Sequence, residues 1–251
     1  MIIVATTTPD YPSFPSTACL LQNKLECKHI PAFDVSAACS GFSYALNIAS
    51  QFIATNAHKT ILIVGADCLS KKVNFKDRTT CILFGDGAGA AVITASENNG
   101  ILYSKCYSDG SEANSLIIPS GGTKTPLTKD SLENQDHTIK MDGKNVFKLA
   151  VSKTVEGINA GLQTLNLTVD NIDYLVCHQA NQRILNKIQN QLNIPDNKLL
   201  SNLKKYGNTS SASIPILLTE KNNENQFNTN DIIVLAGFGA GFTWGITIIK
   251  W

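Results

Sequence analysis

The chain has 251 residues, of which 43% are apolar and 16% charged, and its formal net charge is +1. That length can bury the core of one large domain or of two closely packed ones. The near-neutral charge argues against nonspecific attraction to nucleic acid or to a membrane surface. No apolar run approaches the length of a membrane-spanning helix, and the run at the N-terminus is too short for a signal peptide.

The cysteine content indicates a reducing environment. There are seven cysteines, which is an odd number, and no two of them form a C-x-x-C pair. We therefore expect a cytoplasmic protein with neither a disulfide framework nor a thiolate zinc site.

The first part of the chain alternates between apolar runs bounded by turn residues and stretches of helical periodicity. Ser16 is in position to cap a helix over 16–25, and a second helix is expected from Ser40. The glycine-rich stretch 79–96 predicts two strands around a bend. Further strands are expected at 2–8, 31–36, 59–67 and 99–110.

A polar segment rich in turn formers, 119–138, predicts a connecting loop, and a second alternation follows it. Two short motifs, starting at Phe84 and at Phe238, each follow an apolar strand and precede a β-branched run. They suggest internal duplication, with an N-terminal half over 1–118 and a C-terminal half over 139–251. In the second half, helices are expected at 143–165 and 181–192, a strand at 172–180 and a strand pair at 231–251.

Cys39 is the first candidate for chemistry. It lies in "DVSAACSGF", where a short strand meets an amphipathic helix, so its sulfur should face a helix N-terminus that favours the thiolate. Its small neighbours leave room for a substrate. The alternative is an inert buried cysteine, a common role for this residue type.

His178 and Asn208 are the other two candidates. His178 follows a strand at its C-terminal end, where open α/β sheets collect functional groups. Asn208 lies in the turn-like stretch "YGNTSSAS". A structural histidine and simple turn chemistry remain the alternatives for the two residues. Together with Cys39 they would supply a nucleophile, a neutral base or hydrogen-bond donor, and an amide donor.

The segment 85–90 matches the dinucleotide-binding pattern G-x-G-x-x-A. That pattern requires a helix after the glycines, whose N-terminus receives the pyrophosphate. A β-branched run follows instead, so we expect a strand and no nucleotide site. The glycines are better explained by a bend and a close backbone approach.

Five motifs, in order along the whole chain, resemble the ketoacyl-ACP synthase III enzymes. They are "FDVSAACSGF", "ILFGDGAGAAVI", "CHQANQRI", "YGNTSSASIP" and "GFGAGFTWG". The resemblance implies an α/β, thiolase-like fold, in which two duplicated halves form αβαβα layers. It places the family's catalytic triad on Cys39, His178 and Asn208.

The resemblance also implies a reaction. An acyl-CoA primer, expected to be acetyl-CoA, acylates Cys39 and is then condensed with malonyl-ACP, with loss of carbon dioxide, to give 3-oxoacyl-ACP. This is the initiation step of type II fatty acid synthesis. The backbone N–H groups of Cys39 and Ala240 would form the oxyanion hole, and neither a metal nor a redox cofactor is needed.

Further residues are assigned by the resemblance alone. Acyl carrier protein (ACP) is acidic, so basic side chains near the tunnel mouth would form its docking patch. Lys187 would add to that patch, although an ordinary solvated helix face is the preferred reading for it. Phe14 would reach the partner's acyl pocket in a homodimer. CoA and substrate binding falls on Phe14, Leu69, Arg78, Leu83, Lys148, Asn181 and Arg183, and ACP docking on Gln179, Ala180, Asn181, Gln182 and Arg183.

One departure from the family concerns the N-terminus, because the family carries a segment before "IIVATTT" that is absent from this sequence. We therefore expect an incomplete N-terminal half with an exposed sheet edge and exposed apolar surface. Other possibilities are an inactive remnant that binds ACP or a partner subunit, a cysteine hydrolase, and a related synthase of specialised acyl or polyketide products. The "GFGAG" motif is close to the "GFGPG" of chalcone-synthase-like enzymes, with Ala240 in place of the proline.

Overall fold

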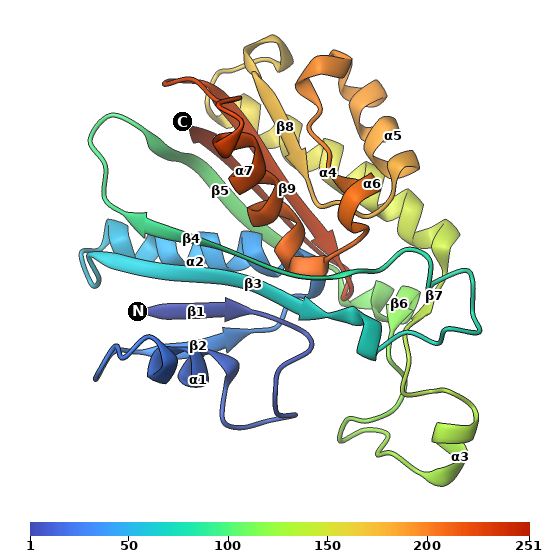
Figure 1. Ribbon diagram of the computed structural model, residues 1–251. Coiled ribbons are helices and arrows are strands. Elements are labelled where there is room, and N and C mark those ends of the chain that lie inside the picture. The colour runs from blue at the N-terminus through green and yellow to red at the C-terminus, as the bar shows by residue number, and fades with distance from the viewer.

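The computed structural model describes residues 1–251 and contains two four-stranded sheets (Figure 1). The first sheet has the order β2 (Ala32–Val35), β1 (Ile2–Ala5), β3 (Thr60–Cys68) and β4 (Asp86–Thr94). Strand β1 is parallel to both of its neighbours, whereas β4 is antiparallel to β3. Because β4 begins at Asp86, inside the glycine-rich motif 85–90, the expected strand stands where a dinucleotide site would need a helix.

The second sheet has the order β5 (Gly100–Ser108), β10 (Thr243–Lys250), β9 (Ile232–Gly239) and β8 (Tyr174–Cys177). Strands β8 and β9 are parallel, and β10 is antiparallel to both of its neighbours. An isolated bridge between Leu175 and Leu199 extends the sheet beyond β8.

Helices separate and cover the two sheets, which gives the expected αβαβα layers. Helices α2 (Gly41–Ala54) and α7 (Ser213–Asn223) lie between the sheets, where α2 packs on strands of both. Helix α1 (Thr17–Lys24) covers the outer face of the first sheet, and Figure 1 shows it below β2. Helices α4 (Gly143–Thr164) and α5 (Gln182–Leu192) cover the outer face of the second. None of the helices is long and apolar enough to cross a bilayer.

Short elements complete the fold. The two-residue strands β6 (Leu116–Ile117) and β7 (Lys140–Met141) pair with each other, and α3 (Lys129–Glu133) lies between them in the chain. Helix α6 (Leu203–Tyr206) precedes the loop that carries Asn208.

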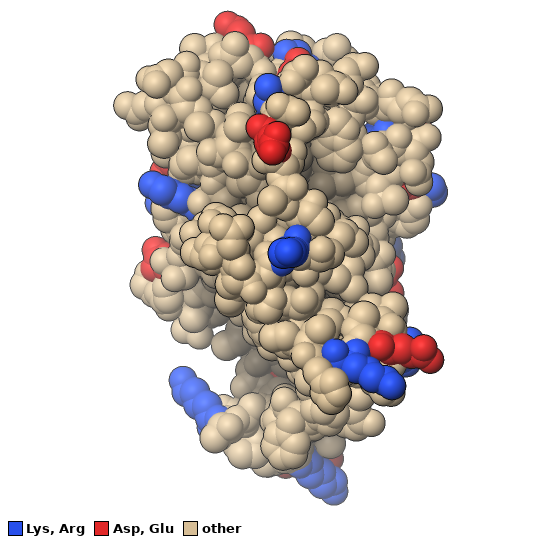
Figure 2. Space-filling view, turned by 90° about the vertical axis from the view of Figure 1, so that its left-hand side faces the viewer, with Lys and Arg blue, Asp and Glu red and all other residues tan.

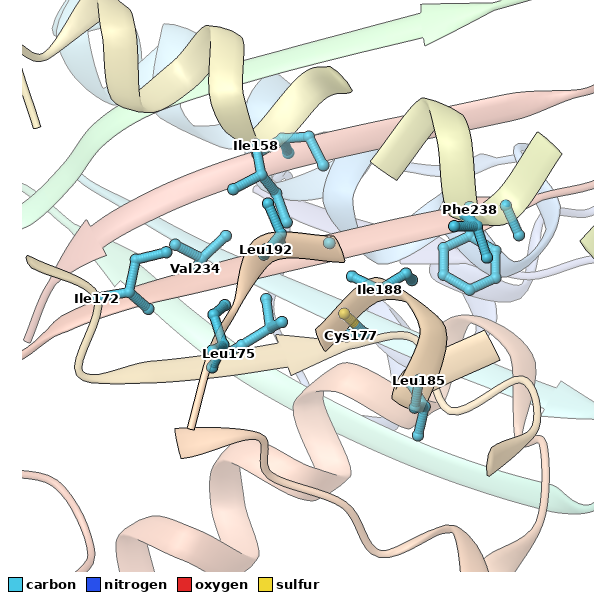
Figure 3. Close-up of a cluster of buried hydrophobic side chains, with 14 of the residues drawn as sticks. Ile158, Ile172, Leu175, Cys177, Leu185, Ile188, Leu192, Val234 and Phe238 are labelled. Carbon is cyan, nitrogen blue, oxygen red and sulfur yellow. The ribbon is translucent and has the colours of Figure 1, made fainter. Parts of the chain in front are cut away.

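Two apolar clusters form most of the core. The larger joins α4 and α5 to the second sheet, with Leu185, Ile188 and Leu192 of α5 facing Leu175 and Cys177 of β8 (Figure 3). The other cluster fills the space between the sheets. There α2 contributes apolar residues at helical spacing, Phe42, Ala45, Leu46 and Ala49, as the sequence predicts.

The expected duplication is visible in the strand order. Strands β1, β3 and β4 of the first sheet correspond to β8, β9 and β10 of the second, with the same relative directions. The second sheet then adds β5 beside β10, whereas no strand lies beside the outer edge of β4. The first sheet is therefore one strand shorter on this side, as expected.

The free edge of β4 exposes apolar surface. Val92, near its end, is 63% exposed. A groove of about 950 Å³ lies beside it, lined by residues of α2, β4, β5 and the C-terminal Trp251. Figure 2 shows the side of the molecule that is on the left in Figure 1, and charged side chains are sparse on it.

Three features differ from the sequence predictions. Residues 79–85 form turns and an isolated bridge, and not the first strand of a pair. The end of this segment is paired with Asn208 by two backbone hydrogen bonds, from Asn208 N to Leu83 O and from Gly85 N to Asn208 O. Strand β5 pairs with β10 of the second sheet. The boundary between the residues of the two sheets therefore lies before Gly100 and not at residue 118. Helix α7 was missed, because its short apolar stretch is interrupted by Pro215.

Candidate active site

Cys39 lies where β2 passes into α2. A single 3₁₀ turn, Ala38–Ser40, carries the cysteine and leads directly into the helix at Gly41. Ala38 has a φ of +47°, an uncommon conformation for a residue with a side chain. Cys39 lies two residues before the first residue of α2, and its side chain is buried.

A mainly apolar cavity opens at Cys39. Its volume is about 310 Å³, at the lower end of the range for ligand pockets. The walls come from the loop after β1, the turn after β3, the strands β6 and β7 with their flanks, and the end of β9. The lining residues are Thr7, Ala38, Cys39, Leu69, Lys72, Phe84, Leu116, Ile117, Ile118, Ile139, Ser210 and Ala240.

Burial determines the protonation state of the resting thiol. Loss of solvation raises the pKa of Cys39 to about 12, and the nearby Ser210 side chain only partly offsets this. The negative charge of Asp67 raises the pKa further. Burial therefore opposes the thiolate that the helix N-terminus is expected to favour.

The end of β9 packs closely on the turn that carries Cys39. A β-carbon built on Gly239 would lie 2.6 Å from the Cys39 nitrogen, so only glycine fits there. The next residue, Ala240, lines the cavity, and no group of the protein accepts a hydrogen bond from its N–H. The Thr243 hydroxyl lies 2.9 Å from the Ala240 carbonyl oxygen and 3.2 Å from that of Ala37, which joins the two turns.

His178 follows β8 and is almost completely buried. Its backbone N–H donates to the Ala236 carbonyl over 2.7 Å, and its Nδ1 lies 2.7 Å from the Ser213 hydroxyl. The ring packs edge-on against Phe238, with centroids 5.2 Å apart. Burial lowers the pKa of His178 to about 3, so the imidazole is neutral at physiological pH.

Asn208 is held against the first half of the chain. Its backbone forms a bridge to Phe84, and its N–H donates to the Leu83 carbonyl over 2.8 Å. The side-chain Oδ1 accepts from the Ser210 N–H at 2.9 Å. Because the oxygen is used in this way, the Nδ2 group is left as the donor that the side chain can offer to a ligand.

Ser210 joins the three predicted residues. It lines the cavity with Cys39, it is bonded to the Asn208 side chain, and its carbonyl raises the pKa of His178. The Ser213 hydroxyl oxygen lies 2.9 Å from the same carbonyl oxygen. Residues 39, 178 and 208, which are far apart in the sequence, therefore meet around one serine.

Sequence reasoning missed two supporting groups. The serines that follow Asn208, among them Ser210 and Ser213, are visible in the sequence but were assigned no role. Asp67 is buried and accepts hydrogen bonds from Thr7 N at 2.7 Å and from Ser211 Oγ at 2.8 Å. The Asp67 carboxylate therefore connects the loop after β1 to the serines that follow Asn208. No local sequence pattern around Asp67 indicates these long-range contacts.

Comparisons with known proteins identify the family of the chain. Two profiles match, described as 3-oxoacyl-[acyl-carrier-protein (ACP)] synthase III, over residues 33–110, and its C-terminal part, over residues 162–251. The β-ketoacyl-[acyl-carrier-protein] synthase III of Natranaerobius thermophilus is 48% identical over the whole of this chain and 77% of its own length.

The chain belongs to the 3-oxoacyl-[acyl-carrier-protein] synthase III family.

Several solved structures share the fold of this chain. The synthase III of Aquifex aeolicus superimposes with a TM-score of 0.90 at 41% identity, over the whole of this chain and 76% of the other. The priming β-ketosynthase of the R1128 polyketide pathway has a TM-score of 0.88 at 30% identity, covering 99% of this chain and 74% of the other.

The residues that the synthase III resemblance assigned to substrate binding have different settings in the structure. Leu69 is buried and lines the cavity at Cys39. Leu83 does not line the cavity. Its carbonyl oxygen accepts a hydrogen bond from the Asn208 N–H. Phe14 is 85% exposed and lies outside the cavity, and Arg78 is exposed in the turns after β3.

The segment predicted to dock ACP is only partly at the surface. Gln179 is fully buried, and its amide bonds to Cys177 O, Ser201 Oγ and Asn202 N. Its assignment to the docking surface is therefore wrong. Ala180 packs against the core, and Asn181 caps α5 by accepting from the Ile184 N–H. Exposed side chains are those of Gln182, Arg183 and Lys187 on α5 and Lys148 on the neighbouring α4.

Proposed function

We propose that the chain catalyses the decarboxylative condensation of an acyl-CoA primer with malonyl-ACP to give 3-oxoacyl-ACP, CoA and carbon dioxide. The observation that carries this proposal is that Cys39 opens into an apolar cavity and shares Ser210 with a neutral imidazole and a side-chain amide. Family membership supports the same reaction.

In the first half-reaction, Cys39 attacks the carbonyl carbon of acetyl-CoA. The bond to the CoA sulfur breaks, a thioester forms at Cys39, and CoA leaves with the proton that the thiol loses. The N–H groups of Cys39 and Ala240 stabilise the oxyanion. Loss of one such donor typically raises the barrier by about 3 kcal/mol.

In the second half-reaction, His178 and Asn208 donate hydrogen bonds to the thioester oxygen of malonyl-ACP. These bonds stabilise the enolate that forms as the bond to the free carboxylate breaks and carbon dioxide leaves. The carbanion then attacks the acyl carbon on Cys39, the bond from that carbon to the Cys39 sulfur breaks, and the released thiolate takes up a proton from water as 3-oxoacyl-ACP departs. A neutral imidazole suits this role, because a charged one would be held at a high cost in so buried a site.

The proposed partners follow from the surface. Arg183 and Lys148 are exposed on neighbouring helices and would attract the acidic ACP, with Lys187 as a weaker contributor. The side chain of Phe14, exposed in one chain, would be covered in a homodimer. Arg78 and Asn181 are proposed to contact CoA.

Acylation of Cys39 tests the first half-reaction. Incubation with radiolabelled acetyl-CoA should place one label on the peptide that contains Cys39, and Cys39→Ala should remain unlabelled. Labelling that is unchanged in Cys39→Ala would refute the proposal, and so would a wild type that takes up no label.

A second candidate within the same chemistry is a priming synthase for specialised products, which the R1128 enzyme's similarity supports. A scan of acyl-CoA primers in the presence of malonyl-ACP separates the two. A preference for acetyl-CoA supports the first candidate, and a preference for a longer or branched primer supports the second.

A further inference from the structure

One residue that lines the mainly apolar cavity at Cys39 carries a cationic group. Besides Cys39, Lys72 is its only ionisable lining residue, and nine of the twelve lining residues are hydrophobic. Lys72 follows the 3₁₀ turn Leu69–Lys71 after β3, and its side chain is half-buried. No motif of the sequence pointed to it.

The backbone of Lys72 is fixed in the cavity wall. Its N–H donates to the Leu69 carbonyl at 2.8 Å, and its carbonyl accepts from the Ile139 N–H at 2.8 Å. Leu69 and Ile139 both line the cavity. The lysine therefore belongs to a defined wall of the cavity.

The charge of Lys72 has no partner in the protein. The three salt bridges of the structure involve Lys153, Lys205 and Lys221, and no carboxylate lines the cavity. An opposite charge next to low-dielectric walls is attracted more strongly than in bulk water. The Lys72 ammonium is therefore available to a carboxylate that enters the cavity.

The position of Lys72 indicates which substrate would carry that carboxylate. Cys39, which would carry the acyl group, lines the cavity, whereas His178 and Asn208, which are proposed to bind the malonyl thioester, do not. The cavity is left for the acyl group of the primer. Resting on the proposed function, we infer that Lys72 selects primers whose acyl chain ends in a carboxylate, such as the succinyl or glutaryl thioester of CoA.

The chemistry of transfer is the same for such a primer. The bond to the CoA sulfur breaks, a thioester to the Cys39 sulfur forms, and the thiol proton leaves with CoA. The distal carboxylate takes no part in the step and only pairs with the Lys72 ammonium. The alternative is that the lysine stem covers apolar surface while its ammonium reaches solvent.

A competition experiment separates these readings. The wild type is incubated with equal concentrations of succinyl-CoA and butyryl-CoA, which have equal acyl chain lengths, and the two acyl forms of Cys39 are quantified by mass spectrometry. Because both primers compete for one sulfur, the ratio does not depend on the fraction of folded protein. The variants are Lys72→Met, Lys72→Arg, which keeps the cation, and Lys71→Met, an exposed neighbour.

We expect the succinyl-to-butyryl ratio to fall about tenfold in Lys72→Met, to be retained largely in Lys72→Arg, and to stay unchanged in Lys71→Met. An unchanged ratio in Lys72→Met overturns the inference, as does an equal fall in Lys71→Met. An effect confined to the KM for malonyl-ACP also overturns it. Acylation by acetyl-CoA with an unchanged ratio refutes only the inference, whereas no acylation by any thioester refutes the proposed function as well.

Discussion

At the scale of single residues, the raised pKa of Cys39 has a measurable consequence. Because the pKa is about 12, the thiolate fraction grows tenfold per pH unit throughout the neutral range. We expect the alkylation rate of Cys39 by iodoacetamide, followed by peptide mapping, to rise about tenfold per unit from pH 6 to 9. A rate that levels off by pH 8 would show a thiolate-stabilising site and contradict this account.

The control for this measurement is a small free thiol under the same conditions. Its pKa of about 8.5 makes its alkylation rate bend over as the pH approaches 9. The difference in curvature between the two profiles isolates the effect of burial at Cys39 from any change in the reagent.

The tautomer of His178 is a second residue-scale prediction. The Ser213 hydroxyl has one proton and two acceptors in reach, His178 Nδ1 at 2.7 Å and the Ser210 carbonyl at 2.9 Å. If His178 is to donate through Nε2, this proton must go to Nδ1. We therefore expect ¹⁵N NMR of the wild type to show the Nε2–H tautomer.

The variants Ser213→Ala and His178→Asn complete this test. The histidine signal that disappears in His178→Asn identifies the residue among the four histidines of the chain. In Ser213→Ala we expect a mixture of tautomers and a lower kcat for condensation, with acylation of Cys39 less affected. A pure Nδ1–H tautomer in the wild type would rule out His178 as the proposed donor.

At the scale of elements, the approach of β9 to the turn before α2 positions the cysteine. In Gly239→Ala the new methyl group would lie 2.6 Å from Cys39 N and 3.1 Å from Cys39 Cβ, so one of the two elements must move. We expect at least a tenfold loss in the rate of Cys39 acylation, since the oxyanion donors would separate.

The matched control is Gly143→Ala in the first turn of α4, where the nearest atom is 3.8 Å away and a helix position favours alanine. This variant should acylate at the wild-type rate. Circular dichroism checks that both variants are folded. If Gly239→Ala reacts as fast as Gly143→Ala, the close approach does not position the site.

The duplicated motifs explain how two halves build one site. Phe84 of the first motif bridges the backbone of Asn208, and Phe238 of the second packs on the ring of His178. Each motif thus supports one proposed donor, and each is followed by an antiparallel strand, β4 or β10. The two copies of the motif therefore hold the two proposed hydrogen-bond donors, Asn208 and His178, one each.

At the scale of the whole molecule, the outer edge of β4 is unpaired and exposes apolar surface. Exposed apolar edge strands pair with other chains, and lysine at such an edge prevents this. We expect Val92→Lys to slow aggregation on heating, measured by light scattering. Leu132→Lys, which adds the same charge at a 46% exposed site on α3, should have a smaller effect. Equal effects would attribute the change to net charge.

The sequence predicted the layers and most elements, because their patterns are local. The N-cap at Ser16, the helical spacing in α2 and the final strand pair were all correct. Residues 79–85 and the sheet assignment of β5 were wrong, because long-range pairing with Asn208 and β10 decides them. In the candidate site, Cys39, His178 and Asn208 were predicted by residue type and motif. Asp67, Lys72 and Ser213 were not, since their roles depend on contacts that no local pattern records.

The most direct test of the central claim is carbon dioxide release in a single turnover. Protein acylated on Cys39 is mixed with malonyl-ACP carrying label in the free carboxyl group, for the wild type, His178→Ala and Asn208→Ala. The account predicts that all three proteins become acylated, that the wild type releases labelled carbon dioxide as 3-oxoacyl-ACP forms, and that both variants release it at least a hundredfold more slowly. Release at the wild-type rate in both variants, or an acyl group that stays on Cys39 of the wild type, would contradict it.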